Sequence, residues 1–115
     1  MRLTSDFWVS AIVRRVFEMG GFAAIEKRGS AEAGAIYVIV RTRSGELMLY
    51  GPAPQTSYDE AKPSDRLFAE VARSTDAAEI LSRLEREKRF DPDLWVVEIE
   101  AEEAAARELL NVKVP

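Results

Sequence analysis

Carboxylates are the residues of this 115-residue chain with the widest chemical scope, because the chain has no histidine and no cysteine. Those two absences exclude a Ser-His-Asp triad, a Cys-His pair, a thiolate nucleophile and a Cys/His zinc site. Catalysis would have to use Asp and Glu, alone or with a hard cation such as Mg²⁺ or Ca²⁺, with Lys, Tyr, Ser or Thr in support. A carboxylate- or metal-dependent enzyme is therefore the class of enzyme left open.

The densest group of carboxylates lies near the C-terminus and consists of Glu98, Glu100, Glu102 and Glu103. The alternation of a strand would place Glu98 and Glu100 on one face. A cation could bind there, but a polar outer strand face leading into the acidic first turn of a helix explains the same pattern. We favour that structural interpretation, and we predict no metal ligand, no catalytic residue and no cofactor.

A nuclease hypothesis can be tested on the order of the expected elements. A helix, three strands and then strand-helix-strand is similar to the core of restriction-endonuclease-like enzymes, which hold magnesium through an acid on the second strand and an acid-x-lysine tripeptide on the third. Residues 35–40 contain no acid, and residues 47–50 contain neither a carboxylate nor a lysine. The one acid-x-lysine match, Glu60-Ala61-Lys62, lies in a proline-rich segment, and about one match is expected by chance. A degenerate nuclease relative stays as the alternative function.

The elements that must position any site begin with a helix near the N-terminus. Thr4-Ser5-Asp6 provides N-cap oxygens, and Gly20-Gly21 provides a C-terminal stop. Between them, apolar residues recur at helical spacing at Val9, Ile12, Val13, Val16 and Phe17. The pattern predicts one helix before residue 20.

Three strands are expected next, at residues 22–28, 35–43 and 47–50, paired antiparallel in succession. Residues 35–40 are apolar on both faces, which indicates a central strand, and a tight Ser44-Gly45 hairpin would set Arg43 across from Glu46.

The second half of the chain predicts a fourth strand, a helix, a fifth strand and a short closing helix at residues 67–72, 76–89, 94–100 and 102–110. The last strand looks half-solvated, and the strand-helix-strand order implies a crossover to a parallel neighbour. We therefore predict a single α+β domain over residues 1–115, with one mixed sheet of about five strands and helices packed on it.

Most aromatic residues lie within or beside apolar runs, so we predict that they belong to the core. These residues are Phe7, Trp8, Phe17, Phe22, Phe68, Phe90 and Trp95. Tyr58 is an exception, because it lies among polar residues in the longest irregular segment of the chain.

That segment, residues 51–65, has three prolines and no periodicity, which is typical of an ordered surface loop. Long loops in compact domains are often functional, although a strap that covers a sheet edge explains the pattern nearly as well. We predict a non-enzymatic binding module that recognises its ligand through residues 50–59. The candidate binding residues are Tyr50, Pro52, Gln55, Thr56, Tyr58 and Asp59.

Composition limits the partners of such a module. The chain has 16 Lys and Arg against 20 Asp and Glu, a net charge of −4, and no dense basic patch, so nucleic acid is a disfavoured partner. It also has neither a signal-peptide pattern nor an apolar run that could span a membrane, so we expect a cytoplasmic location. A protein or a small molecule remains as the partner, and an exposed edge strand would permit a homodimer.

Three segments resemble a known family over essentially the whole chain. They are RLTSDFWVSA at residues 2–11, LYGPAPQTSYD at residues 49–59 and FDPDLWVVEIE at residues 90–100. These motifs are similar to those of the domain of unknown function 1491 family of small alphaproteobacterial proteins. The family carries no established activity, so the resemblance implies a bacterial cytoplasmic protein and says nothing about catalysis.

Overall fold

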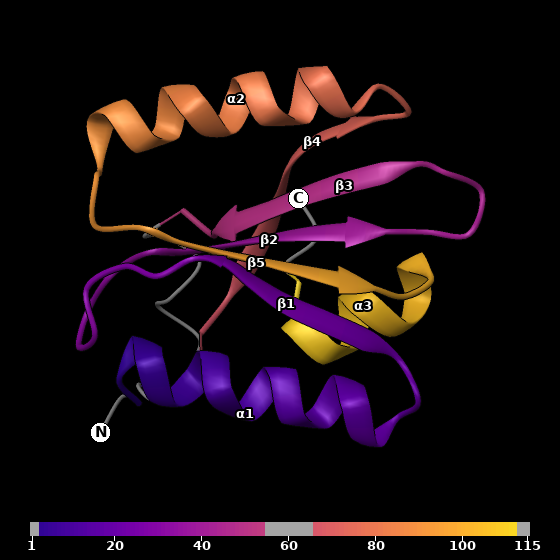
Figure 1. The fold of residues 1–115 in the computed structure, drawn as a ribbon, viewed down its shortest axis with the longest axis horizontal. Coiled ribbons are helices and arrows are strands. Elements are labelled where there is room, and N and C mark those ends of the chain that lie inside the picture. Colours follow the sequence, from indigo (N-terminus) through magenta and orange to yellow (C-terminus); the bar gives the residue numbers. More distant parts are fainter. Residues whose placement is uncertain (1–2, 55–65, 113–115) are drawn as a thin grey trace.

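A five-stranded mixed sheet lies between two layers of helices in the computed structural model, which describes residues 3–54 and 66–112 (Figure 1). The elements follow in the order α1 (Ser5–Glu18), β1 (Phe22–Lys27), β2 (Ile36–Arg41), β3 (Leu47–Pro52), β4 (Phe68–Ser74), α2 (Ala77–Phe90), β5 (Trp95–Glu100) and α3 (Glu103–Leu110). This order confirms the predicted α+β fold class. Within the described ranges, every helix is too short or too polar to span a bilayer.

The end of α1 follows from the two glycines. Gly20 has a φ of +83°, a left-handed conformation that glycine adopts at no steric cost. Its N–H donates to Phe17 O at 3.0 Å, and the Gly21 N–H donates to Val16 O at 2.9 Å. These two hydrogen bonds form a Schellman motif and satisfy carbonyls that the helix end would leave unpaired.

The start of α1 is held by tertiary contacts. Thr4 is the N-cap residue, but its side chain makes no capping hydrogen bond. The N–H groups of Ser5 and Asp6 donate instead to the carbonyls of Glu32 and Ala31, at 3.1 and 2.9 Å. The segment between β1 and β2 therefore caps the helix.

The strand order β1-β5-β2-β3-β4 corrects the predicted pairing of the first three strands. β5 lies between β1 and β2, antiparallel to β1 and parallel to β2. The antiparallel meander is thus β2-β3-β4. β5 is largely buried rather than half-solvated, because Trp95, Val96 and Val97 are apolar on both faces, whereas Glu26 and Lys27 suit β1 for the sheet edge.

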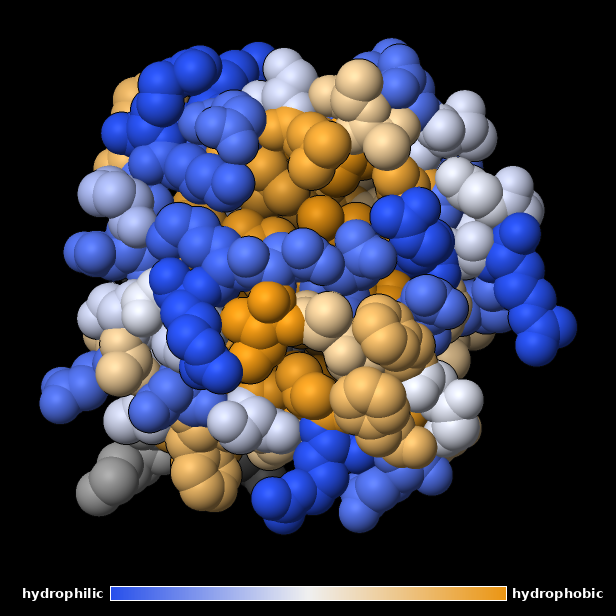
Figure 2. All heavy atoms as spheres, viewed as in Figure 1, coloured by the Kyte–Doolittle hydropathy of each residue, from blue (hydrophilic) through white to orange (hydrophobic). Residues whose placement is uncertain are grey.

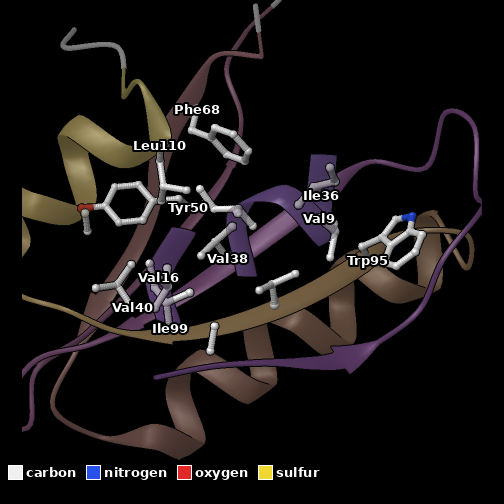
Figure 3. Packing of buried hydrophobic residues seen from close by; sticks show 14 of the residues in the cluster. Val9, Val16, Ile36, Val38, Val40, Tyr50, Phe68, Trp95, Ile99 and Leu110 are labelled. Carbon is white, nitrogen blue, oxygen red and sulfur yellow. The ribbon is translucent and has the colours of Figure 1, made fainter. Parts of the chain in front are cut away.

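Two apolar clusters hold the layers together, one on each face of the sheet. In the larger cluster, Val16 of α1 packs near Val40 and Ile99 of the sheet, while Leu110 of α3 lies beside Tyr50 (Figure 3). The second cluster lies under α2 and consists of Ile39, Leu47, Leu49, Ile80, Leu84, Leu94 and Val96. The connection through α2 takes the chain from β4 to β5, whose parallel neighbour is β2.

The hairpin between β2 and β3 is one residue longer than predicted. The Thr42 N–H donates to Glu46 O at 3.1 Å, and Gly45 has a φ of +92°. Thr42 rather than Arg43 therefore lies across from Glu46, and Arg43 belongs to the loop.

Candidate functional site

A pocket of about 700 Å³ opens at the end of the sheet where the parallel strands β2 and β5 finish. The C-terminal end of α1, the β2–β3 hairpin and α3 surround it, and these parts lie together at one end of the molecule (Figure 1, right). We call it the α1–α3 pocket. In parallel α/β sheets, crevices beyond the carboxyl ends of the strands are a common place for ligands.

One side of the pocket is apolar. Its lining includes Val16, Met19 and Phe22 from α1 and the start of β1, and Ala101, Ala105 and Leu109 from the chain leading into α3. Gly20 and Gly21 also line it, and a Cβ atom at Gly21 would lie 3.1 Å from Val16 Cγ1 and 3.3 Å from Glu100 O. The absence of a side chain at Gly21 therefore lets α1 approach the end of β5 closely.

The other side of the pocket is polar and carries positively and negatively charged side chains. It is lined by Arg41, Thr42, Arg43, Glu100 and Glu102. Arg41 donates to the Glu98 carboxylate at 3.3 Å, and the Arg43 N–H donates to Glu102 Oε2 at 3.0 Å. In residues 3–54 and 66–112, neither the Arg43 guanidinium nor the Glu100 carboxylate makes an ion pair. Both are free to meet a charged group of a ligand.

Large apolar side chains are exposed beside the pocket. Phe17, Met19 and Phe22 are 51%, 60% and 46% exposed, and the rings of Phe17 and Phe22 meet edge to face with their centroids 6.0 Å apart. Figure 2 shows apolar side chains gathered on this face on both sides of a band of hydrophilic ones, the lower group between β1 and α1. An exposed group of apolar side chains such as the lower one is typical of an interaction surface.

The prediction that most aromatic residues are core residues is wrong for four of them. Phe7, Phe17, Phe22 and Phe90 are exposed, whereas Phe68 and Trp95 are buried, and the Trp8 ring packs at a tilt against Phe68 with the ring centroids 5.2 Å apart. The inner stripe of α1 is already filled by Val9, Ile12 and Val16. Phe17 follows Val16 by about 100° around the helix and so points away from that stripe. α1 therefore has more apolar residues than its buried stripe can hold, and this excess was the sequence signal for a surface patch.

Of the binding residues predicted from the sequence, the structure describes Tyr50 and Pro52. Tyr50 is fully buried in β3, where its hydroxyl lies 3.5 Å from Met48 Sδ and the Arg107 guanidinium lies 5.9 Å from its ring centroid. Burial raises the pKa of the Tyr50 hydroxyl, so the side chain is neutral and structural in its setting. Pro52 is exposed at the end of β3.

The other four predicted residues, Gln55, Thr56, Tyr58 and Asp59, lie outside the described residues, as does the Glu60-Ala61-Lys62 tripeptide. Recognition through the 50–59 loop therefore stays a prediction. Where the described part of this loop begins, the Tyr37 ring lies against Gly51. A Cβ atom at Gly51 would come within 2.6 Å of Tyr37 Cε2.

Glu98, Glu102 and Glu103 of the C-terminal cluster point to different partners. Glu98 pairs with Arg41, Glu102 accepts the N–H of Arg43, and Glu103 pairs with arginines of β4 and α3. Within the part of the chain that the structure describes, no group of three or more Asp or Glu side chains is arranged to hold a metal ion. The sequence neighbours are thus separated by the change from strand to helix.

The family model of a protein of unknown function, DUF1491, matches residues 3–110. This chain belongs to the DUF1491 family. No curated protein matches it significantly. The family has no assigned function, and the three sequence motifs noted above all overlap the matched range.

Solved structures of the family share this fold. The chain is 49% identical to protein Atu0922 from Agrobacterium tumefaciens, whose solution structure superposes with a TM-score of 0.84 and coverage of 100% of this chain and 98% of that one. A DUF1491 family protein from Caulobacter crescentus is 35% identical in its crystal structure and 34% in its NMR structure. Both superpose with a TM-score of 0.77, over 99% of this chain and 100% and 99% of theirs.

Proposed function

We propose that this chain is a non-enzymatic protein-binding module that holds an apolar side chain of its partner in the α1–α3 pocket. The observation that carries the proposal is the opening of a 700 Å³ pocket directly beside the exposed side chains of Phe17, Met19 and Phe22. Burying these side chains against a partner would release free energy, at roughly 25 cal/mol per Å² of apolar surface removed from water.

The residue types favour a protein over a small molecule. Aromatic residues, Met and Arg are enriched at the centres of protein interfaces, and all three types surround this pocket. Met adds adaptability, because its unbranched side chain repacks around different anchors. The free charges of Arg43 and Glu100 lie at the polar side, where they would orient the partner rather than supply most of the affinity.

Two further expectations belong to the same proposal. The 50–59 loop would contribute recognition through Gln55, Thr56, Tyr58 and Asp59, as the sequence predicts. The module would act in the cytoplasm, which fractionation of cells expressing the tagged protein would test.

A selection from a phage-displayed library of random dodecapeptides tests the pocket. We expect enriched peptides with at least one large apolar residue, and we expect the variant Ala105→Trp to lose their binding because the indole would fill the pocket. Ala104→Trp is the matched control, since Ala104 is exposed on the same helix but does not line the pocket. The proposal fails if no peptide is enriched, or if folded Ala105→Trp binds the peptides as well as Ala104→Trp does.

A further inference from the structure

The two edges of the sheet differ in how they are covered. At the β4 edge, Phe68 forms a parallel bridge with Val112, and Arg73 donates to Glu103 of α3 at 2.7 Å. At the other edge, β1 pairs with β5 on its inner side, and no described strand pairs with its outer side. The outer backbone N–H and C=O groups of β1 are therefore available to another strand.

The outer side of β1 is also incompletely buried. Ala24 and Ile25 are half-buried, Phe22 is exposed, and Phe17 of α1 covers only one side of the Phe22 ring. Figure 2 views the molecule from the β1 side and shows apolar side chains above and below the hydrophilic band. A strand laid beside β1 would complete the burial of these residues.

The charged residues at the end of β1 limit which kind of strand could pair with its outer edge. The ladder with β5 is irregular between Ile25 and Lys27, so the regular part of β1 covers residues 22–25. Lys27 Nζ donates to Pro92 O and Leu94 O, both at 2.8 Å, which turns its positive charge away from the edge. Glu26 is exposed and makes no ion pair among the described residues. Arg28, just beyond β1, is also exposed, but its guanidinium lies over the Trp95 ring at 6.0 Å from the centroid. Within β1, the open segment therefore ends on the negative charge of Glu26.

A second copy of the chain would place no cation opposite Glu26 at this edge. If two copies paired antiparallel through residues 22–25, Gly21 of the other copy would lie opposite Glu26, and shifts of up to two residues would place one of residues 19–23 there, all of which are uncharged. A separate peptide with a Lys or Arg at that position would instead pair with the Glu26 carboxylate. Charge complementarity therefore favours a partner with a basic residue.

We infer that an extended, apolar and basic segment of a partner protein adds as a sixth strand to residues 22–25 of β1. Alternate side chains of the segment pack on Phe17 and Phe22, and a basic residue pairs with Glu26. Gly20, Gly21 and Phe22 line the α1–α3 pocket, and β1 begins at Phe22. A segment paired with β1 therefore reaches the pocket as it passes residue 22. This inference rests on the proposed function, since the anchor residue of the same segment occupies the pocket.

Synthetic copies of the enriched peptides test the binding mode in two measurements. Hydrogen exchange followed by NMR should show outward-facing amides in residues 22–25 exchanging at least about tenfold more slowly with peptide bound. Glu26→Lys should weaken binding by about three- to tenfold, with a loss of salt dependence. Glu108→Lys is the matched control, because Glu108 is also exposed and makes no ion pair with the described residues, but it lies on α3.

The outcomes separate this inference from the proposed function. Peptides whose binding needs Ala105 but leaves the β1 amides unprotected would overturn strand addition alone. Peptides that protect β1 equally in Ala105→Trp would overturn the pocket as the anchor site and leave strand addition standing. A concentration-dependent dimer that protects residues 22–25 without peptide would show that a second copy takes this edge, and that result would overturn the inference.

Discussion

Arg73 of β4 and Glu103 of α3 are joined by two hydrogen bonds, at 2.7 Å from Nη2 and 3.1 Å from Nη1. Arg107 donates to the same carboxylate at 3.0 Å, and Arg73 also binds Glu70 at 2.7 Å. This network ties α3 to the outer strand of the sheet. Since α3 forms one wall of the α1–α3 pocket, the same network positions that wall.

The pH dependence of stability should report this network. Hydrogen bonds from Arg73 and Arg107 lower the pKa of Glu103 from 4.5 to about 2. A depressed folded-state pKa stabilises the fold above the unfolded pKa, and this contribution is lost as the pH falls from about 4.5 to about 2. Glu103→Gln should therefore lower the melting temperature slightly at neutral pH and low salt, and the difference from wild type should vanish near pH 2. A difference that persists there would contradict the prediction, and Glu108→Gln is the control.

Ser5→Ala should cost about 1–2 kcal/mol of unfolding free energy. The Ser5 hydroxyl is fully buried and donates to Gly34 O at 2.6 Å, so its loss leaves a buried carbonyl without that donor. Thr4→Ala, one residue earlier, should change the unfolding free energy far less because Thr4 is exposed and makes no capping bond. Urea denaturation of both variants compares them directly, and equal losses would contradict the assigned roles.

Gly29→Ala should destabilise the fold by about 1–3 kcal/mol. A Cβ atom at Gly29 would collide with the backbone of Asp93 and lie 2.6 Å from Leu94 C, where the chain passes into β5. Ala33→Ser is a suitable control in the same connection, because Ala33 is exposed. Thermal denaturation should separate the two variants, and a Gly29→Ala melting curve that overlays wild type would show that this contact relaxes freely.

The 50–59 loop can be tested through its polar residues. Alanine at Gln55, Tyr58 and Asp59 should leave the melting temperature nearly unchanged while it weakens partner binding, as expected of a recognition surface. Both quantities can be measured on the triple variant with the selected peptides. A large loss of melting temperature would instead identify the loop as a structural strap.

Divalent cations should leave the melting temperature unchanged. A ligand that binds the folded state raises the melting temperature by mass action, and no described carboxylate group is arranged to hold a metal. A thermal-shift series with Mg²⁺, Mn²⁺ and Ca²⁺ measures this. A clear rise that disappears in Glu98→Gln or Glu100→Gln would revive the metal-dependent enzyme hypothesis.

Local signals in the sequence predicted the elements well, because each depends on neighbours along the chain. The two glycines end α1 through hydrogen bonds to residues three and five positions before them. Asp76 caps α2, as its position predicted: its Oδ1 accepts a hydrogen bond from the Ala78 N–H at 2.9 Å. The fold class followed from the order of such elements.

Pairing between distant segments could not be predicted in the same way. The β1–β2 connection is too long to force a hairpin, so hydrophobicity on both faces decided the order and placed β5 between β1 and β2. The side chains exposed at the surface depend on how much space the facing layer offers. Phe17 and Phe22 looked like core residues because they lie in or beside apolar runs, and only the packed structure shows them at the surface.

By itself, the sequence determined the chemistry that is excluded, the α+β class, the order of the helices and strands along the chain, and the family likeness. These properties depend on residue types and on short-range hydrogen bonding. Only the tertiary structure decided that the end of α1, the β2–β3 hairpin and α3 enclose a pocket, that the C-terminal carboxylates point to different partners, and that β1 is the open edge. These properties depend on contacts between segments tens of residues apart, which are decided by the packing of both sheet faces rather than by any local pattern.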